Sequence, residues 1–171
     1  MFDEQTIIEE MLQYICNTLE QSHSAFGDLP ICPFARQTRM NDKIQFLVYP
    51  FDFNDIISDS LLTKTINQFS HTQTADVLVV VHPMREALDL STFELYLKQL
   101  NEYLHPTQLV AFGGHPQDLF NIEGVLTRQD PYINFVVQSI SELKQATQQL
   151  LKTRYYDRWS NDNLKAINVS R

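Results

Sequence analysis

Two histidines in this sequence each follow an apolar, strand-like segment and stand directly before a proline. His82 lies near the end of the segment Asp76 to Pro83, and His115 follows Gln108 to Phe112 and two glycines. In open α/β folds, ligands bind at the sheet edge where the carboxyl ends of parallel strands meet, so we expect the two imidazoles to be neighbours there. Each would then serve as a base or a metal ligand. The alternative is that each imidazole only caps strand-end carbonyls or packs beneath a helix.

Cys32 stands in a loop before a proline and is the third catalytic candidate beside His82 and His115. As a thiolate it could be a nucleophile, a metal ligand or a haem ligand. Arg36 lies four residues further on, and its charge would lower the pKa of the thiol if the loop folded back. The three residues would make a three-ligand site, although their spacing matches no metal signature, so no metal or other cofactor is identified. The alternative is a cysteine buried as a small apolar group.

Gly113 and Gly114 follow the third predicted strand and are two of the four glycines in the chain. Lacking a Cβ, they would let the backbone approach a ligand closely or adopt a positive φ, whereas the alternative is an ordinary strand-end turn. The other glycines stand at positions 27 and 124. This distribution excludes both the G-x-G-x-x-G dinucleotide fingerprint and the G-x-x-x-x-G-K-[ST] phosphate loop.

Length and charge limit the classes of function further. The 171 residues suit one α/β domain over positions 1–171. A formal charge of −8 would repel a phosphate backbone or an anionic bilayer, so nucleic acid and membranes are not expected partners. The motifs of serine hydrolases and zincins do not occur.

The cysteine content and the amino-terminal segment indicate a cytoplasmic protein. Two cysteines do not make a disulfide framework, so reduced thiols are expected. The segment MFDEQTIIEEML is acidic where a signal peptide is basic, and no apolar run approaches the roughly 20 residues of a membrane span.

Apolar residues at three- and four-residue spacing predict amphipathic helices over Glu4 to Gln21, about Asn54 to Phe69, and Ser91 to Leu104. The capping boxes Ser91-x-x-Glu94 and Ser139-x-x-Glu142 mark the start of the third helix and of a fourth. The stretch Ser22 to Asp42 has no sustained periodicity and is predicted to be irregular. The segment from Tyr155 to Arg171 is polar with one tryptophan and shows no clear pattern.

Four β-branched or aromatic segments predict strands: Lys43 to Pro50, Asp76 to Pro83, Gln108 to Phe112 and Tyr132 to Gln138. The resulting order is α-β-α-β-α-β-β-α, and we expect an α/β fold with a mixed, mostly parallel sheet of about four strands and flanking helices. The connection Asn121 to Asp130 could return the last strand antiparallel. The run Val77 to Val81 is apolar throughout, which places it centrally with both faces buried.

Four short blocks occur in a recognisable order: ICPFA at 31–35, VHP at 81–83, HP at 115–116, and Arg128 followed by Pro131-Tyr132. In this order they resemble an uncharacterised bacterial family, a domain of unknown function. Its pattern combines a Cys-Pro-Phe-Ala element, two strand-end His-Pro turns and an arginine before Pro-Tyr. The resemblance runs from the first helix to the last. It implies that Cys32, His82, His115 and Arg128 occupy the family's characteristic polar positions, but it implies no particular activity.

We interpret the chain as a small enzyme or cofactor-binding protein whose pocket lies at the strand carboxyl ends, a metal- or haem-dependent oxidoreductase being its most concrete form. The candidate ligand-binding residues are Arg36, Gly113, Gly114 and Arg128, with Arg128 as an anion anchor through its forked donors. The partner would be a small-molecule ligand, and a homo-oligomer is compatible with the sequence. The alternative is a non-catalytic interaction or oligomeric protein whose contacts come from Phe51, Phe53, Tyr155, Tyr156 and Trp159.

Overall fold

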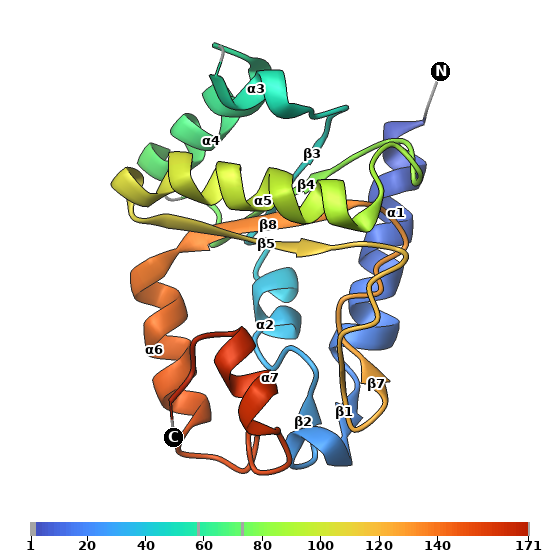
Figure 1. The fold of residues 1–171 in the computed structure, drawn as a ribbon, viewed down its shortest axis with the longest axis vertical. Helices are drawn as coiled ribbons and strands as arrows, with labels where there is room; N and C mark the ends of the chain where they lie inside the picture. The colour runs from blue at the N-terminus through green and yellow to red at the C-terminus, as the bar shows by residue number, and fades with distance from the viewer. Residues whose placement is uncertain (1–2, 58, 73, 171) are drawn as a thin grey trace.

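A mixed β-sheet lies at the centre of the computed structural model, which describes residues 3–57, 59–72 and 74–170 (Figure 1). In these ranges four strands pair in the order β3 (Ile44–Val48), β4 (Val77–Val81), β8 (Asn134–Ser139) and β5 (Leu109–Gly114). Strands β3 and β4 are parallel, whereas β8 is antiparallel to both of its neighbours. Strands β3, β4 and β5 therefore run in one direction, and β8 runs in the other.

The predicted mixed α/β class, with about four strands and flanking helices, is confirmed for the described part of the chain. The sheet is less parallel than expected, because β8 lies between β4 and β5 and pairs antiparallel with each. Residues 115–133, all described, join β5 to β8 through the short hairpin of β6 (Asn121–Ile122) and β7 (Val125–Leu126). A strand parallel to β5 would require a long crossover connection, usually with a helix. This connection contains no helix, so β8 runs antiparallel to β5.

Strand β4 is an inner strand, as its apolar run predicted. Leu78 and Val80 are buried in one core cluster, and Val79 and Val81 are buried in another on the opposite face. A strand with β3 on one side, β8 on the other and apolar layers above and below is shielded from water on every side.

Three helices cover the upper face of the sheet in Figure 1: α3 (Phe53–Ile57), α4 (Leu61–Thr72) and α5 (Leu90–Leu104). The single helix expected from Asn54 to Phe69 is thus two. The break has a local cause, since the Ser60 hydroxyl accepts a hydrogen bond from the Thr63 backbone N–H and caps the start of α4. Helix α5 begins one residue earlier than expected, and its cap is Asp89 rather than Ser91.

The other face carries α1 (Glu4–Tyr14), which continues as the π-helical turn η1 (Ile15–Leu19), together with α2 (Ala35–Met40), α6 (Ile140–Leu150) and α7 (Asn161–Ala166) (Figure 1). Helix α1 packs Ile7 and Met11 against Val48, Val79 and Val81. Helix α6 has no buried residue, and Ser139 precedes it without capping it through its side chain. The lower face is therefore tightly covered by α1 and only loosely by α6.

The segments that the sequence left irregular fold together below the sheet. Residues 22–42 form the small strands β1 (Ser22–His23) and β2 (Leu29–Pro30), the 3-10 turn η2 (Ser24–Phe26) and α2. Phe26 packs against Tyr155 and Trp159 from the carboxyl-terminal segment, with ring centroids 5.3 and 6.0 Å away. These contacts join the two segments into one cluster. Among the described residues, no helix is both long and apolar enough to cross a membrane.

Candidate functional site

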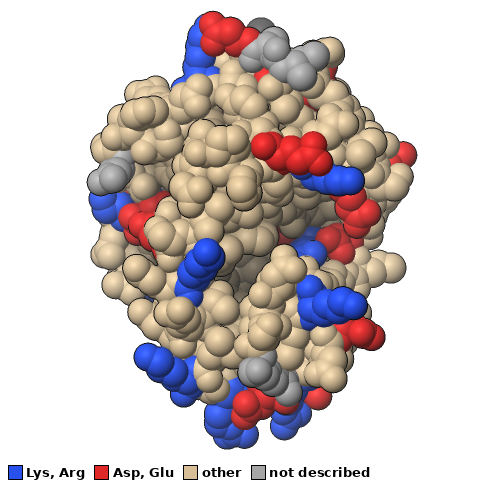
Figure 2. Space-filling model, turned by 60° about the vertical axis from the view of Figure 1, so that its left-hand side comes forward, with Lys and Arg blue, Asp and Glu red and all other residues tan. Residues whose placement is uncertain are grey.

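A large cavity lies below the main sheet, between η1, α2 and α6. Its volume is about 810 Å³, and Figure 2 shows a hollow in this side of the molecule, bordered mostly by uncharged surface. Val79, Phe112 and Val136 line it from the sheet, while Ala146 and Thr147 line it from α6. Leu143 and Leu150 of α6 also line it, and none of the α6 side chains is buried. We call it the sheet cavity.

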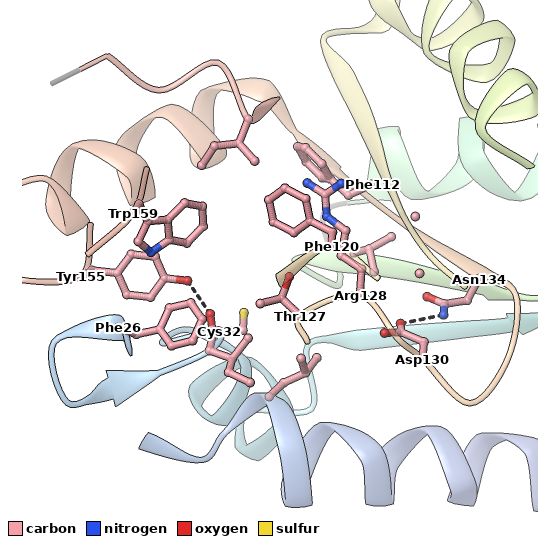
Figure 3. Close-up of a pocket in the computed structure, with 16 residues that line it drawn as sticks. Phe26, Cys32, Phe112, Phe120, Thr127, Arg128, Asp130, Asn134, Tyr155 and Trp159 are labelled. Atoms are coloured by element: carbon pink, nitrogen blue, oxygen red, sulfur yellow. Dashed lines mark hydrogen bonds between the residues drawn. The ribbon is translucent and has the colours of Figure 1, made fainter. Parts of the chain in front are cut away.

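A smaller pocket of about 250 Å³ adjoins the sheet cavity at the carboxyl end of β5. The two spaces have six lining residues in common: Leu19, Ile31, Cys32, Phe112, Val136 and Tyr155. The smaller one is also lined by Arg128, Asp130 and Asn134, so we call it the Arg128 pocket (Figure 3). Together they form two adjoining spaces with an apolar wall on the side of the sheet, whereas α2 and α6 add polar side chains such as Gln37 and Gln145 on the other side of the sheet cavity.

The structure brings some of the predicted site residues together and leaves others out. Cys32, Gly113, Gly114 and Arg128 line the Arg128 pocket. His82, His115 and Arg36 line neither space. The expected grouping of Cys32 with the two histidines is therefore not present around these cavities.

The two histidines share one structural role. The Nδ1 atom of His82 accepts a hydrogen bond from the Met84 backbone N–H at 3.1 Å, and that of His115 accepts one from Gln117 at 3.0 Å. In both turns the imidazole thus bridges the intervening proline. Both residues are buried, and Nε2 of His115 bonds the Leu88 carbonyl at 3.0 Å. The observed role is structural, as in the alternative, but each Nδ1 accepts a backbone N–H of its own turn rather than capping a strand-end carbonyl.

His82 also packs with its ring edge on Phe51, at a centroid distance of 5.2 Å. Burial lowers the pKa of the imidazole, which favours the neutral form that can accept the Met84 hydrogen bond. Strand β4 ends directly before His82 and β5 ends directly before His115, and β8 alone lies between these two strands.

Cys32 lies in the wall shared by the two cavities. Its backbone N–H donates to the Leu19 carbonyl at 2.9 Å, which attaches the loop to the π-helical end of α1. The expected lowering of the thiol pKa by Arg36 is wrong. Burial raises the pKa of Cys32, and the nearby Glu20 carboxylate adds to the shift, while Arg36 is exposed. A protonated thiol is the resting form at neutral pH.

Gly113 and Gly114 allow close packing within the protein, and neither adopts a positive φ. A Cβ on Gly113 would lie 2.4 Å from Leu97 Cδ1, so this residue lets α5 approach the sheet. A Cβ on Gly114 would lie 2.1 Å from Asp130 Oδ2. Gly114 therefore makes room for the Asp130 carboxyl rather than for a ligand.

The half-buried Asp130 and the buried Asn134 form a polar pair at the end of the Arg128 pocket. The Asn134 amide nitrogen donates to Asp130 Oδ2 at 2.7 Å and to the Tyr132 carbonyl at 3.0 Å (Figure 3). Burial raises the pKa of Asp130, while interactions with the Tyr14 hydroxyl and with Asn134 oppose that shift. Burial and the charge of Asp130 also raise the pKa of Tyr14. The carboxyl thus holds its proton more tightly than a solvated aspartate does.

Asn134 was not among the predicted site residues, although the sequence contains one feature that points to it. Asn134 and Gln138 are polar residues four apart in the otherwise apolar segment Tyr132 to Gln138. In a strand this spacing puts both on the same face as Val136, which lines the cavity. An asparagine on the inward face of an inner strand indicates a specific hydrogen-bonding role.

Arg128 carries the positive charge of the pocket lining. Its guanidinium lies over the Phe120 ring, 4.1 Å from the centroid, and Figure 3 shows Phe112 beside it. None of the ion pairs or side-chain hydrogen bonds among the described residues includes the guanidinium. Because stacking uses the face of the group, its in-plane N–H donors stay free for a ligand.

A metal centre is not assembled from the described residues, since no group of three or more His, Cys, Asp or Glu side chains is placed to hold an ion. Comparisons with protein families, with curated proteins and with solved structures found no match to this chain. The chemistry of the site thus rests on its own geometry.

Proposed function

We propose that this protein binds a small organic molecule in the sheet cavity and the adjoining Arg128 pocket. The observation that carries the proposal is the pair of adjoining spaces of about 810 and 250 Å³, which share an apolar wall and have the charged and amide groups of Arg128 and Asn134 at one end. Ligand sites in proteins are typically concave and mostly apolar, with a few convergent polar groups that fix orientation.

The position of the pocket supports the same proposal. It lies at the carboxyl end of β5, the sheet edge at which α/β folds bind ligands. The residues of its walls come from segments far apart in the chain, including Leu19, Cys32, Phe112 and Tyr155. An unfilled space of this size lowers the stability of the fold, because the side chains around it lack packing partners. A bound molecule would supply those contacts.

Binding is better supported than thiol catalysis or a metal-dependent reaction. The raised pKa of Cys32 disfavours a resting thiolate, and the histidine Nδ1 atoms are engaged by backbone N–H groups. The alternative of an interaction protein is less well supported. Four of its five proposed contact residues, Phe51, Tyr155, Tyr156 and Trp159, are buried inside the protein and are not accessible to a partner.

The test uses Nile red, a neutral apolar dye whose fluorescence rises on leaving water. We expect the purified protein to bind it, and Ala146→Phe to remove most of that signal by filling the sheet cavity from α6. Ala166→Phe is the matched control, because Ala166 is exposed on α7 and lines neither space. No dye binding, or equal binding by both variants, would contradict the proposal.

A further inference from the structure

We infer that the molecule bound here is an amphiphilic organic acid that also carries a hydrogen-bond donor: its acid group lies on Arg128, its donor on the Asn134 amide oxygen, and its apolar body in the sheet cavity. This inference rests on the proposed function and adds the chemical class of the ligand. Three independent features of the site support it.

The first feature is the unpaired cation. Arg128 is half-buried, its guanidinium face is covered by Phe120, and its charge has no carboxylate partner among the described residues. A guanidinium removed from water without a counterion is costly, and a planar carboxylate matches its forked donors. Asp130, which also lines the pocket, is directed to Asn134 and Tyr14 instead. An acid group from the ligand would complete this site.

The second feature is an acceptor without a donor. Asn134 is 1% exposed, and both hydrogen bonds that the described residues make with its amide use the nitrogen. The Tyr132 carbonyl can only accept, which fixes the nitrogen on that side and leaves Oδ1 on the other. Figure 3 shows the amide oxygen on the side facing Arg128, with the nitrogen turned to Asp130. The oxygen is not one of the fully buried, unpaired side-chain atoms of the described residues, so it is open to the pocket, where a hydroxyl or N–H group of a ligand can donate to it.

The third feature is the apolar continuation. Leu19, Ile31, Phe112 and Val136 line both spaces, so an apolar chain anchored at Arg128 would lie along the sheet side of the sheet cavity and leave its polar α2 and α6 side to water. Burial of that chain would supply most of the binding energy, whereas the acid and the donor would fix its direction.

Trp159 gives the experiment a built-in reporter, because it is the one tryptophan of the sequence and lines the Arg128 pocket. Its fluorescence is followed during titration with decan-1-ol, decanoate, and 2- and 3-hydroxydecanoate. We expect decanoate to bind at least about tenfold more tightly than the alcohol, which is the effect of one charge-assisted hydrogen-bonded pair. At least one hydroxydecanoate should bind a further threefold or more, about the effect of one neutral hydrogen bond.

Two variants test the anchor. Arg128→Gln should weaken decanoate binding at least about tenfold while leaving decan-1-ol binding unchanged, since only the acid contacts the guanidinium. Arg154→Gln is the matched control, because that arginine is exposed and lines neither space. Asn134→Leu should remove the preference for the hydroxylated acid. The probe series on the unsubstituted protein tests the donor site even if this last variant does not fold.

The outcomes separate the inference from the proposed function. Equal affinity for alcohol and acid, or decanoate binding that ignores Arg128→Gln, would overturn the acid-binding inference. The acid-binding inference is also overturned if Nile red binds in the sheet cavity but none of the decanoate series binds. If Nile red fails as well, the proposed function itself is wrong.

Discussion

Replacing Gly114 by alanine tests the closest contact around the candidate site. The new Cβ would lie 2.1 Å from Asp130 Oδ2 and 2.9 Å from Asn134 Nδ2, both far inside van der Waals separation. The two groups are hydrogen-bonded to each other and Asn134 is buried, so a shift of either side chain breaks a hydrogen bond. The carboxyl must move, and the Asn134–Asp130 hydrogen bond is lost with it.

The size of the effect follows from those two consequences. Overpacking a well-filled site costs about 1–3 kcal/mol, and the lost hydrogen bond adds about 0.5–1.5 kcal/mol. We therefore expect Gly114→Ala to lower the free energy of unfolding by about 2–4 kcal/mol. For a chain of this length the corresponding drop in Tm is about 5–15 °C. No backbone strain contributes, because the φ of Gly114 is not positive.

The assay is urea unfolding followed by Trp159 fluorescence, arranged as a double-mutant cycle with Asp130→Ala. Without the carboxyl only the milder 2.9 Å contact with Asn134 Nδ2 remains, so Gly114→Ala in that background should cost at least about 1 kcal/mol less than in the unsubstituted protein. Gly124→Ala is the comparison, since nothing lies within 4 Å of its Cβ but its φ is +84°. Its cost of about 1 kcal/mol is conformational and should not depend on Asp130. Equal costs of Gly114→Ala in both backgrounds would refute the packing argument.

Three further predictions concern single side chains. Burial raises the pKa of Asp130, so ionisation of this carboxyl lowers the free energy of unfolding as the pH rises from the ordinary aspartate pKa to the raised one, and the loss is constant above that range. Asp130→Asn should remove this pH dependence, which urea unfolding across that pH range measures. An unchanged pH profile of stability in the variant would contradict the prediction. The buried Cys32 thiol should react with iodoacetamide at neutral pH far more slowly in the native protein than in urea, and mass spectrometry showing equal rates would contradict the raised pKa. His82→Ala should cost about 2–4 kcal/mol by opening a void beside Phe51 and leaving the Met84 N–H without its acceptor. His82→Asn, which can accept the same hydrogen bond, should cost at least about 1 kcal/mol less, as thermal unfolding of the two variants would show.

Local sequence patterns were sufficient to predict the type and position of most main elements. The run Val77 to Val81 indicated an inner strand, and its burial on both faces confirms it. The helical spacing predicted α5, and α1 together with its π-helical continuation η1, to within two residues at each end. These predictions succeed because the period of apolar residues depends on which faces of one segment are buried, and that information lies within the segment.

The sequence also located part of the candidate site without revealing its chemistry. Cys32, Gly114 and Arg128 line one pocket, whereas His82 and His115 turn to cap their own backbones. The local sequence His-Pro is the same whether the imidazole faces a ligand or accepts a hydrogen bond from the backbone N–H two residues further on. Which of these occurs depends on neighbours such as Phe51, which no local pattern specifies.

The tertiary structure alone decided where β8 lies and what its side chains face. Its insertion between β4 and β5 places Asn134 beside Asp130 and turns Val136 toward the sheet cavity. Strand order depends on contacts between segments distant in the chain, and a polar residue such as Asn134 becomes significant only when those contacts bury it at the edge of a pocket. The sequence by itself determined the elements and their apolar faces, and only the assembled fold determined the space that remains between them.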